Sequence, residues 1–129
     1  MSHLLNIYHE YLECLNRQAW NELANFVCDQ VCYNSKDIGL TGYRSMLEQN
    51  YREIPDLYFK AGLLVANSPF VACRLEFKCS PIGEFMKLPV NGRTVQFAEN
   101  VFYEFKDDKI KEVWSVIDKA AIEKQLSLR

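Results

Sequence analysis

The first half of the chain carries apolar residues at helical spacing. Intervals of three and four residues predict a helix from Ser2 to about Leu15, a shorter helix that begins near Trp20, and a third helix entered at Thr41. Pro55 ends the third helix, because proline disfavours the helical conformation of the residue before it. The apolar positions of these helices are Leu4, Leu5, Tyr8, Leu12 and Leu15, then Trp20, Leu23, Phe26 and Val27, then Tyr43, Met46, Leu47, Tyr51 and Ile54.

After Pro55 the apolar spacing changes to two, which is typical of β-strands. The second strand is the cleanest case, because its apolar residues share one face and its charged residues share the other. The predicted strands span residues 57–65, 70–79, 94–106 and 109–117. A closing helix runs from near Asp118 to about Leu126. This order predicts one α+β domain over residues 1–129, with three N-terminal helices packed on a curved antiparallel sheet and a short C-terminal helix.

The predicted layout contains a pocket. A strongly bent sheet wrapped around a helix leaves a cone whose open end can hold a small molecule. Residues 81–92 form an irregular excursion between the second and third strands. Phe85 and Met86 would be the apolar underside of a lid if residues 81–88 closed over the opening, and the alternative is an ordinary surface loop.

Glu99 is the first candidate for a catalytic residue. In the long third strand, it shares a face with Phe97 and Val101. A carboxyl group among apolar side chains has a raised pKa and can transfer protons. Two alternatives exist: a β-bulge that turns Glu99 to solvent, or an ion pair with Arg74 or Arg93.

The last strand supplies a second candidate. Continuing the alternation of Ile110, Glu112 and Trp114 brings Asp118 to the side of Trp114, so an acid and an aromatic wall would face the mouth of the cone together. Asp118 would then take a proton from an activated carbon or orient a ligand hydroxyl. The alternative is that Asp118 caps the final helix. Asn34 could aim its amide into the cavity, although asparagine at a strand end is also a common turn residue.

Charge and hydropathy exclude some partners. The 15 Lys and Arg residues against 17 Asp and Glu residues leave a net charge of −2, which provides no concentrated positive field for nucleic acid or anionic lipid. The longest apolar stretch, residues 61–66, is too short to span a bilayer, and the first residues lack the basic region of an export signal. We therefore expect a cytoplasmic protein that binds neither nucleic acid nor membrane.

The histidines and cysteines narrow the chemistry further. His3 and His9 lie six residues apart on one helix and point in different directions, so they predict neither a metal cluster nor an activated nucleophile. An odd number of cysteines without an export signal is expected to be free thiols rather than disulfides. These cysteines are Cys14, Cys28, Cys32, Cys73 and Cys79. Catalysis, if present, would depend on carboxylates without a metal or organic cofactor.

A set of short motifs runs in a fixed order along nearly the whole chain. The set is Tyr33-Asn34, Ile54-Pro55-Asp56-Leu57, Gly92-Arg93, Phe97 to Phe105, Lys109-Ile110, Glu112, Trp114-Ser115, Asp118 and Gln125-Leu126. The set resembles the SnoaL-like polyketide cyclase (ester cyclase) family of the NTF2-like superfamily. The resemblance implies an NTF2-like (cystatin-like) cone, a homodimer packed through the sheet, and a deep pocket between sheet and helices. It also implies that Asp118 is the general acid/base of an intramolecular aldol closure.

The sequence departs from this family pattern at several positions. Glu104 stands in place of a usual basic residue, and the turn reads Asp107-Asp108-Lys109 where Asp-Gly-Lys is usual. Val101 and Val113 stand where the resemblance leads us to expect histidine. Polarisation of a substrate ketone would therefore fall to Asn34, Glu99 or water.

Two hypotheses follow for function. The first is an enzyme that removes a proton next to a carbonyl of a small hydrophobic substrate, in cyclisation or isomerisation, with Asp118 as base and Glu99 as partner acid. Its candidate ligand-binding residues are Tyr33, Asn34, Tyr51, Phe85, Met86 and Trp114. The second is a non-catalytic small-molecule-binding or dimerisation module, in which Asp118 is only a helix cap and Glu99 is paired with an arginine.

Overall fold

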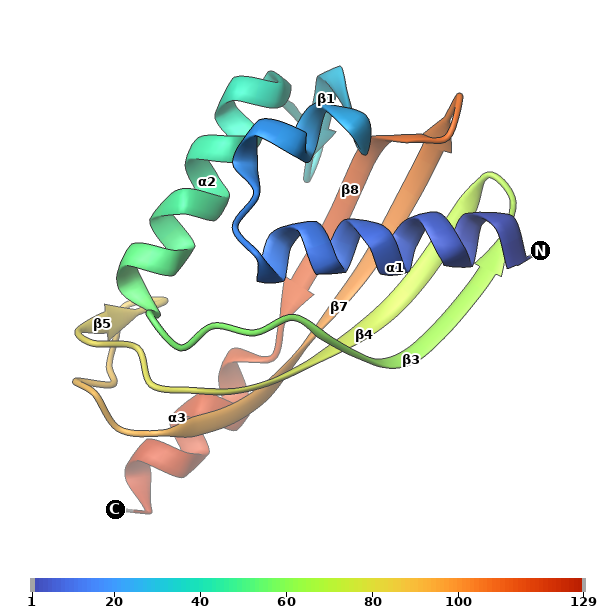
Figure 1. Cartoon of the computed structure of the whole chain (residues 1–129). Helices are drawn as coiled ribbons and strands as arrows, with labels where there is room; N and C mark the ends of the chain where they lie inside the picture. The colour runs from blue at the N-terminus through green and yellow to red at the C-terminus, as the bar shows by residue number, and fades with distance from the viewer. Residues whose placement is uncertain (1, 129) are drawn as a thin grey trace.

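The alternating segments after Pro55 form the centre of a curved six-stranded sheet in the computed structural model, which describes residues 2–128 (Figure 1). The helices are α1 (Ser2–Asn16), the 3₁₀-helix η1 (Trp20–Asn25), α2 (Gly39–Glu53) and α3 (Lys119–Ser127). The strands are β1 (Val27–Tyr33), β2 (Lys36–Asp37), β3 (Lys60–Asn67), β4 (Phe70–Cys79), β5 (Glu84–Phe85), β6 (Leu88–Pro89), β7 (Val95–Lys106) and β8 (Lys109–Ile117). The predicted α+β class is confirmed. No helix within the described range is long and apolar enough to cross a bilayer.

The sheet has the strand order β2-β1-β8-β7-β4-β3, and β5 pairs with β6 as a separate small hairpin. The strands β3, β4, β7 and β8 pair antiparallel, as predicted, but β1 joins β8 in parallel. The second predicted helix is a 3₁₀-helix that ends at Asn25, so Val27 begins a strand instead of ending a helix. The sheet is therefore mixed, and α2 contacts the added strand β1.

A β-bulge reverses the alternation in β3. The register with β4 shifts between Ala61 and Leu63, so Gly62 is the extra residue. Leu63 and Val65 consequently point away from the core and are 69% and 66% exposed. The alternation alone predicted them on the same face as Phe59, which is buried.

A second bulge has the same effect in β8. The pairing with β7 passes through Ile110 before the shift and through Glu112 after it, so Lys111 is the extra residue. Beyond the bulge, Ser115 faces the interior and its hydroxyl reaches a carboxylate of β7, while Trp114 faces the opposite side of the sheet. This one inserted residue decides which side chains of β8 can meet a ligand.

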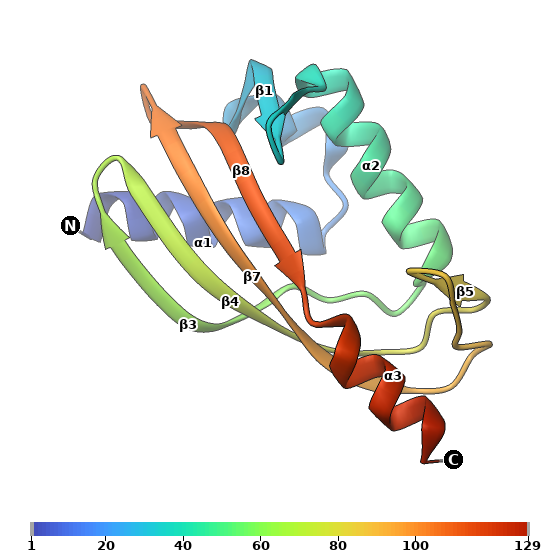
Figure 2. The ribbon, with the colours of Figure 1, turned by 180° about the vertical axis from the view of Figure 1, so that it is seen from behind.

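Tyrosine hydroxyls join the N-terminal helix to the rest of the core. Helix α1 lies across one face of β3, β4 and β7 (Figures 1 and 2). The Tyr8 hydroxyl donates to the Tyr103 hydroxyl of β7 over 3.1 Å, and the Tyr11 and Tyr43 hydroxyls form a 2.7 Å hydrogen bond between α1 and α2. All four side chains are buried. The two pairs satisfy hydroxyls that would otherwise be buried at a cost in stability.

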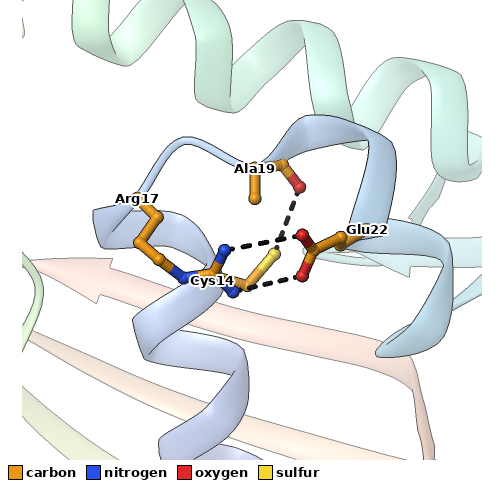
Figure 3. A network of polar contacts seen from close by, with 4 residues as sticks. All are labelled: Cys14, Arg17, Ala19 and Glu22. Atoms are coloured by element: carbon orange, nitrogen blue, oxygen red, sulfur yellow. Dashed lines mark hydrogen bonds and ion pairs between the residues drawn. The ribbon is translucent and has the colours of Figure 1, made fainter.

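The corner between α1 and η1 is held by polar contacts at the end of α1 (Figure 3). The Arg17 guanidinium lies 3.1 Å from the Glu22 carboxylate, and the Cys14 thiol donates to the Ala19 carbonyl oxygen over 3.4 Å. The ion pair is half-exposed, so it contributes little to stability and mainly orients η1.

All five cysteines are free, as predicted. Cys14, Cys73 and Cys79 are buried. Burial raises the pKa of each of these thiols, to about 12 for Cys79. The buried cysteines are therefore protonated and pack as small apolar side chains.

The buried tyrosine pair between α1 and α2 provides a test of the fold. Replacing Tyr11 with Phe leaves the Tyr43 hydroxyl without its partner, so we expect a loss of about 1–3 kcal/mol in the free energy of unfolding. Tyr58→Phe, at a site that is 63% exposed, should change it by less than about 0.5 kcal/mol. Urea denaturation measures both variants, and equal stability of the two would contradict the structural role of the pair.

Candidate functional site

A cavity of about 110 Å³ lies between the sheet and the second half of α2. It is lined by Tyr33, Met46, Asn50, Ile54, Leu57, Phe59, Phe77, Phe85, Phe97, Glu99 and Ile117. A smaller space of about 40 Å³ extends toward α1 and shares part of this lining, including Tyr33, Asn50 and Glu99. Apart from Tyr33, Asn50 and Glu99, the cavity of about 110 Å³ is walled by apolar side chains. Because an apolar cavity of about 150 Å³ accommodates benzene, a ligand that fills this one has about the size of a single ring.

Glu99 projects into the cavity from the centre of β7. The pairing of β7 with β4 is continuous over ten residue pairs, so no bulge turns Glu99 outward. Glu99 is partly buried and its carboxylate accepts a hydrogen bond from the Ser115 hydroxyl. Burial raises the pKa of Glu99, and the bond from Ser115 offsets part of the effect. Glu99 therefore points inward among apolar side chains, as the alternation of the strand predicted.

The alternative ion pairs of Glu99 do not form. Arg74 donates from Nη1 to Oδ1 of Asn100 over 3.2 Å, and Arg93 donates from Nε to the Val90 carbonyl oxygen over 3.0 Å. The two arginines that could have neutralised the carboxylate are thus engaged elsewhere.

Ser115 is held in place through its backbone by Asn34. The Ser115 amide donates to Oδ1 of Asn34 over 2.8 Å, and Nδ2 of Asn34 donates to the Ser115 carbonyl oxygen over 3.3 Å. The Asn34 side chain is therefore used to attach the end of β1 to β8. This corrects the expectation that Asn34 aims its amide into the cavity. Tyr33, which precedes it, does line the cavity and interacts with Ser115.

Asp118 and Trp114 lie outside the cavity, contrary to the expected placement. Asp118 is exposed and its Oδ1 accepts from the Ala121 amide over 3.2 Å, which caps α3. Trp114 pairs with Phe102 on the opposite face of the sheet. The bulge at Lys111 explains the difference, because it shifts the alternation on which the prediction for both residues depended.

Of the remaining predicted ligand-binding residues, Phe85 lines the cavity, whereas Met86 and Tyr51 do not. Phe85 lines the cavity and stacks against Phe97, with ring centroids 5.6 Å apart. Met86 has a left-handed backbone with φ of 52° at the tip of the β5–β6 hairpin and is not among the lining residues. Tyr51 is turned toward α1, where its hydroxyl donates to the Leu15 carbonyl oxygen over 3.0 Å.

Two polar residues of the site were missed from the sequence alone. Asn50 interrupts the apolar stripe of α2, four residues after Met46 and four before Ile54, and this interruption is a signal that could have identified it. Ser115 was missed because the bulge in β8 was not recognised. The three-residue step from Ile110 to Val113, where two are expected, is the corresponding signal.

The polar side chains that line the cavity are those of Tyr33, Asn50 and Glu99. Within residues 2–128, no three or more His, Cys, Asp and Glu side chains gather in an arrangement that could hold a metal ion. The lining residues of the described chain include no Lys or Arg, so the Glu99 carboxylate faces no opposite charge across the cavity.

The raised pKa of Glu99 makes stability depend on pH. In the folded protein this carboxyl group holds its proton to higher pH than in the unfolded chain. Its ionisation therefore destabilises the fold as the pH rises from the usual Glu pKa of about 4.3 through the raised pKa of Glu99. Glu99→Gln cannot ionise. We expect its melting temperature to approach that of the wild type at acid pH and to exceed it increasingly toward alkaline pH.

The matched control is Glu123→Gln, which alters an exposed carboxylate of α3. Thermal unfolding over a pH series checks the expectation. A difference between Glu99→Gln and the wild type that stayed constant with pH would show that Glu99 is not desolvated.

Comparison with known proteins identifies relatives of this fold. Residues 5–126 match the family described as SnoaL-like polyketide cyclase. A SnoaL-like polyketide cyclase from Agrobacterium tumefaciens has 53% sequence identity and a TM-score of 0.96, with 98% of this chain and 99% of that chain covered. No curated protein matches the chain.

More distant structures share the fold alone. IdmH from Streptomyces antibioticus has 17% identity and a TM-score of 0.83, with 97% of this chain and 99% of that chain covered. AclR from Streptomyces galilaeus has 21% identity and a TM-score of 0.78, with 100% and 98% covered. The family match over nearly the whole length, together with the 53% identity to a solved member, shows that the chain belongs to the SnoaL-like polyketide cyclase family.

Proposed function

We propose that this protein catalyses cofactor-free proton transfer next to a carbonyl of a small hydrophobic substrate, as a cyclase or isomerase. The observation that carries the proposal is the Glu99 carboxyl group, which has a raised pKa and faces an apolar cavity. Membership of the SnoaL-like polyketide cyclase family supports the same class of chemistry. Glu99 takes the role of the base, because Asp118 caps α3 on the surface.

The proposed reaction uses one carboxylate as the base and passes through an enolate intermediate. Ionised Glu99 removes a proton from the carbon next to the carbonyl, and the electron pair of the broken C–H bond moves to the carbonyl oxygen. Protonated Glu99 then returns the proton to another carbon in an isomerisation. In an intramolecular aldol closure, the enolate carbon attacks a second carbonyl carbon of the substrate, the π electrons of that carbonyl move to its oxygen, and protonated Glu99 gives its proton to the resulting alkoxide. A raised pKa helps, because it reduces the gap in acidity between the carboxyl group and the carbon acid.

The surroundings of Glu99 favour this use of the carboxylate. Aromatic side chains of β4, β5 and β7 wall the cavity and exclude water from the enolate. The Ser115 hydroxyl orients the carboxylate, and Asn34 fixes the position of Ser115 in turn. The cavity volume limits the substrate to a compound with about one ring unless the β5–β6 hairpin moves.

A test of this function uses a β,γ-unsaturated cyclohexenone, a one-ring ketone. Proton removal and return convert it to the conjugated enone, which absorbs in the ultraviolet, and the reaction in deuterium oxide labels the product. We expect turnover above the buffer rate and a loss of about 10²- to 10⁴-fold in Glu99→Gln. Asp118→Ser, which retains a capping side chain, should keep the wild-type rate.

Two results would count against the proposal. Equal rates for the wild type and Glu99→Gln would remove Glu99 from the chemistry. Binding of the ketone with neither isomerisation nor deuterium uptake would favour the alternative of a non-catalytic small-molecule-binding module.

We also propose that two copies of this chain pair through the outer face of the sheet. Val65, Ala72, Phe102 and Trp114 are consecutive cross-strand partners, so they form one apolar row over β3, β4, β7 and β8. Phe102 is 61% exposed, and Figure 2 shows the side of the sheet on which α1 lies behind β3, β4 and β7. A continuous exposed apolar row on a sheet is typical of a surface that associates.

If two copies pair through this row, one charged side chain placed within it should disrupt the dimer. Phe102→Glu places a carboxylate in the middle of the apolar row, so we expect the protein to sediment as a monomer while its circular dichroism is unchanged. Tyr58→Glu, at an equally exposed aromatic outside the sheet, should leave the dimer intact. A wild-type protein that sediments as a monomer at micromolar concentration would contradict the proposal.

A further inference from the structure

We propose that the side-chain amide of Asn50 binds the carbonyl oxygen of the substrate and thereby selects the carbon that faces Glu99. The assignment deepens the proposed function and rests on it, because it takes the ligand to be a carbonyl compound. It concerns a group on α2, whereas Glu99 and Ser115 belong to the sheet.

The position of Asn50 is the first argument. It lines both the cavity of about 110 Å³ and the smaller space behind it, as Glu99 also does. The two residues come from elements on opposite sides of the cavity, α2 and β7. Met46 and Ile54, one helical turn away on either side, are apolar and line the same cavity. Asn50 is thus the polar group that α2 presents to a ligand between helix and sheet.

The second argument is that the Asn50 amide is free to bind a ligand. Its side chain makes no hydrogen bond within residues 2–128, although it is half-buried. The other polar side chains near the cavity are engaged. The Ser115 hydroxyl donates to Glu99, and Tyr11 and Tyr43 bind each other. An amide in an apolar wall that has no protein partner is suited to a ligand oxygen.

The chemistry of an amide fits this task better than a charged group would. The Asn50 Nδ2 group donates hydrogen bonds to an oxygen that becomes negative when Glu99 removes the proton, and such donors stabilise enolates and other oxyanions. Because the amide is neutral, it adds no net positive charge that would stabilise the ionised form of Glu99. A lysine or arginine at the same place would lower the pKa of the Glu99 carboxyl group and oppose the burial that raises it.

The pairing of one donor and one base also predicts selectivity. A compound whose carbonyl oxygen contacts Asn50 presents its neighbouring carbon to Glu99, whereas a hydrocarbon of the same shape leaves the amide without a partner. A site built to hydrogen-bond an oxygen rejects an analogue that lacks it.

The experiment uses cyclohexanone as a probe that binds without isomerising. We expect the infrared stretching band of its carbonyl to lie at lower frequency when it is bound to the wild type than in an apolar solvent, because the Asn50 amide donates to the oxygen. In Asn50→Leu this shift should disappear, and the affinity should fall by about 3- to 10-fold. Methylenecyclohexane, which has the same shape and no oxygen, should bind the wild type less tightly than cyclohexanone does, and this preference for the ketone should disappear in Asn50→Leu.

Two further variants keep the test decisive. Asn50→Ala removes the donor without adding a charge and places a strong helix former in α2, so it should lose the shift even if the leucine variant fails to fold. Asn25→Leu makes the same change at an exposed asparagine outside the cavity and should behave as the wild type. In the isomerisation assay, Asn50→Leu should lower kcat by about 10²-fold.

The outcomes separate this assignment from the proposed function. A carbonyl band that is unshifted in the wild type, or equally shifted in the Asn50 variants, overturns the role of Asn50 even if Glu99-dependent turnover is found. A shift that depends on Asn50 without turnover supports the binding role and overturns the proposed catalysis. Absence of any bound cyclohexanone overturns the assignment.

Discussion

The hydrogen bond from Ser115 to Glu99 is the contact on which the site depends. A carboxyl group placed among apolar side chains is costly unless it is protonated or hydrogen-bonded, and Glu99 meets both conditions in part. The bond exists only because the bulge at Lys111 turns Ser115 inward. Asn34 then fixes Ser115 through its backbone, so the end of β1 supports a side chain of β8. One inserted residue thus connects the register of the sheet to the chemistry of the cavity.

The tyrosines of the core determine how much space remains beside this carboxyl group. Tyr11 and Tyr43 close the region behind Glu99 with a hydrogen bond, and Tyr8 does the same with Tyr103. Their rings fill volume that apolar residues would also fill. Their hydroxyls in addition fix the orientation of the side chains, because each hydroxyl must lie within hydrogen-bond distance of its partner. The helices α1 and α2 are therefore held at a defined distance from the sheet. Three of these tyrosines, Tyr11, Tyr43 and Tyr103, line the smaller space of about 40 Å³ beside Glu99, so this packing limits its volume.

The two faces of the sheet serve different purposes. The inner face carries the cavity, with Glu99 among aromatic residues, and the outer face carries the apolar row that contains Phe102 and Trp114. Strand alternation separates these roles, since neighbouring residues of β7 point to opposite sides. A substitution on one face consequently need not disturb the other. The proposed site on the inner face and the proposed association on the outer face can therefore be studied by separate variants.

The sequence by itself determined the fold class, the family and the inward orientation of Glu99. These follow from local periodicity, which is a property of consecutive residues and survives folding wherever a strand is regular, as β7 is throughout its pairing with β4. Motifs spread over the chain were also sufficient for the family, because they depend on order and spacing alone.

Tertiary structure decided the rest of the site. The placement of Trp114 and Asp118 could not be predicted from alternation, because a bulge depends on how β8 pairs with its neighbours. The parallel attachment of β1, which brings Asn34 to Ser115, joins residues far apart in the chain. Asn50 stood in the sequence as one polar residue in an apolar stripe, and only the packing of α2 against the sheet placed its amide in a cavity with Glu99. The local sequence pattern determines which way a side chain points within a regular helix or strand. Which residues it contacts depends on the packing of elements far apart in the chain, and no short segment encodes that packing.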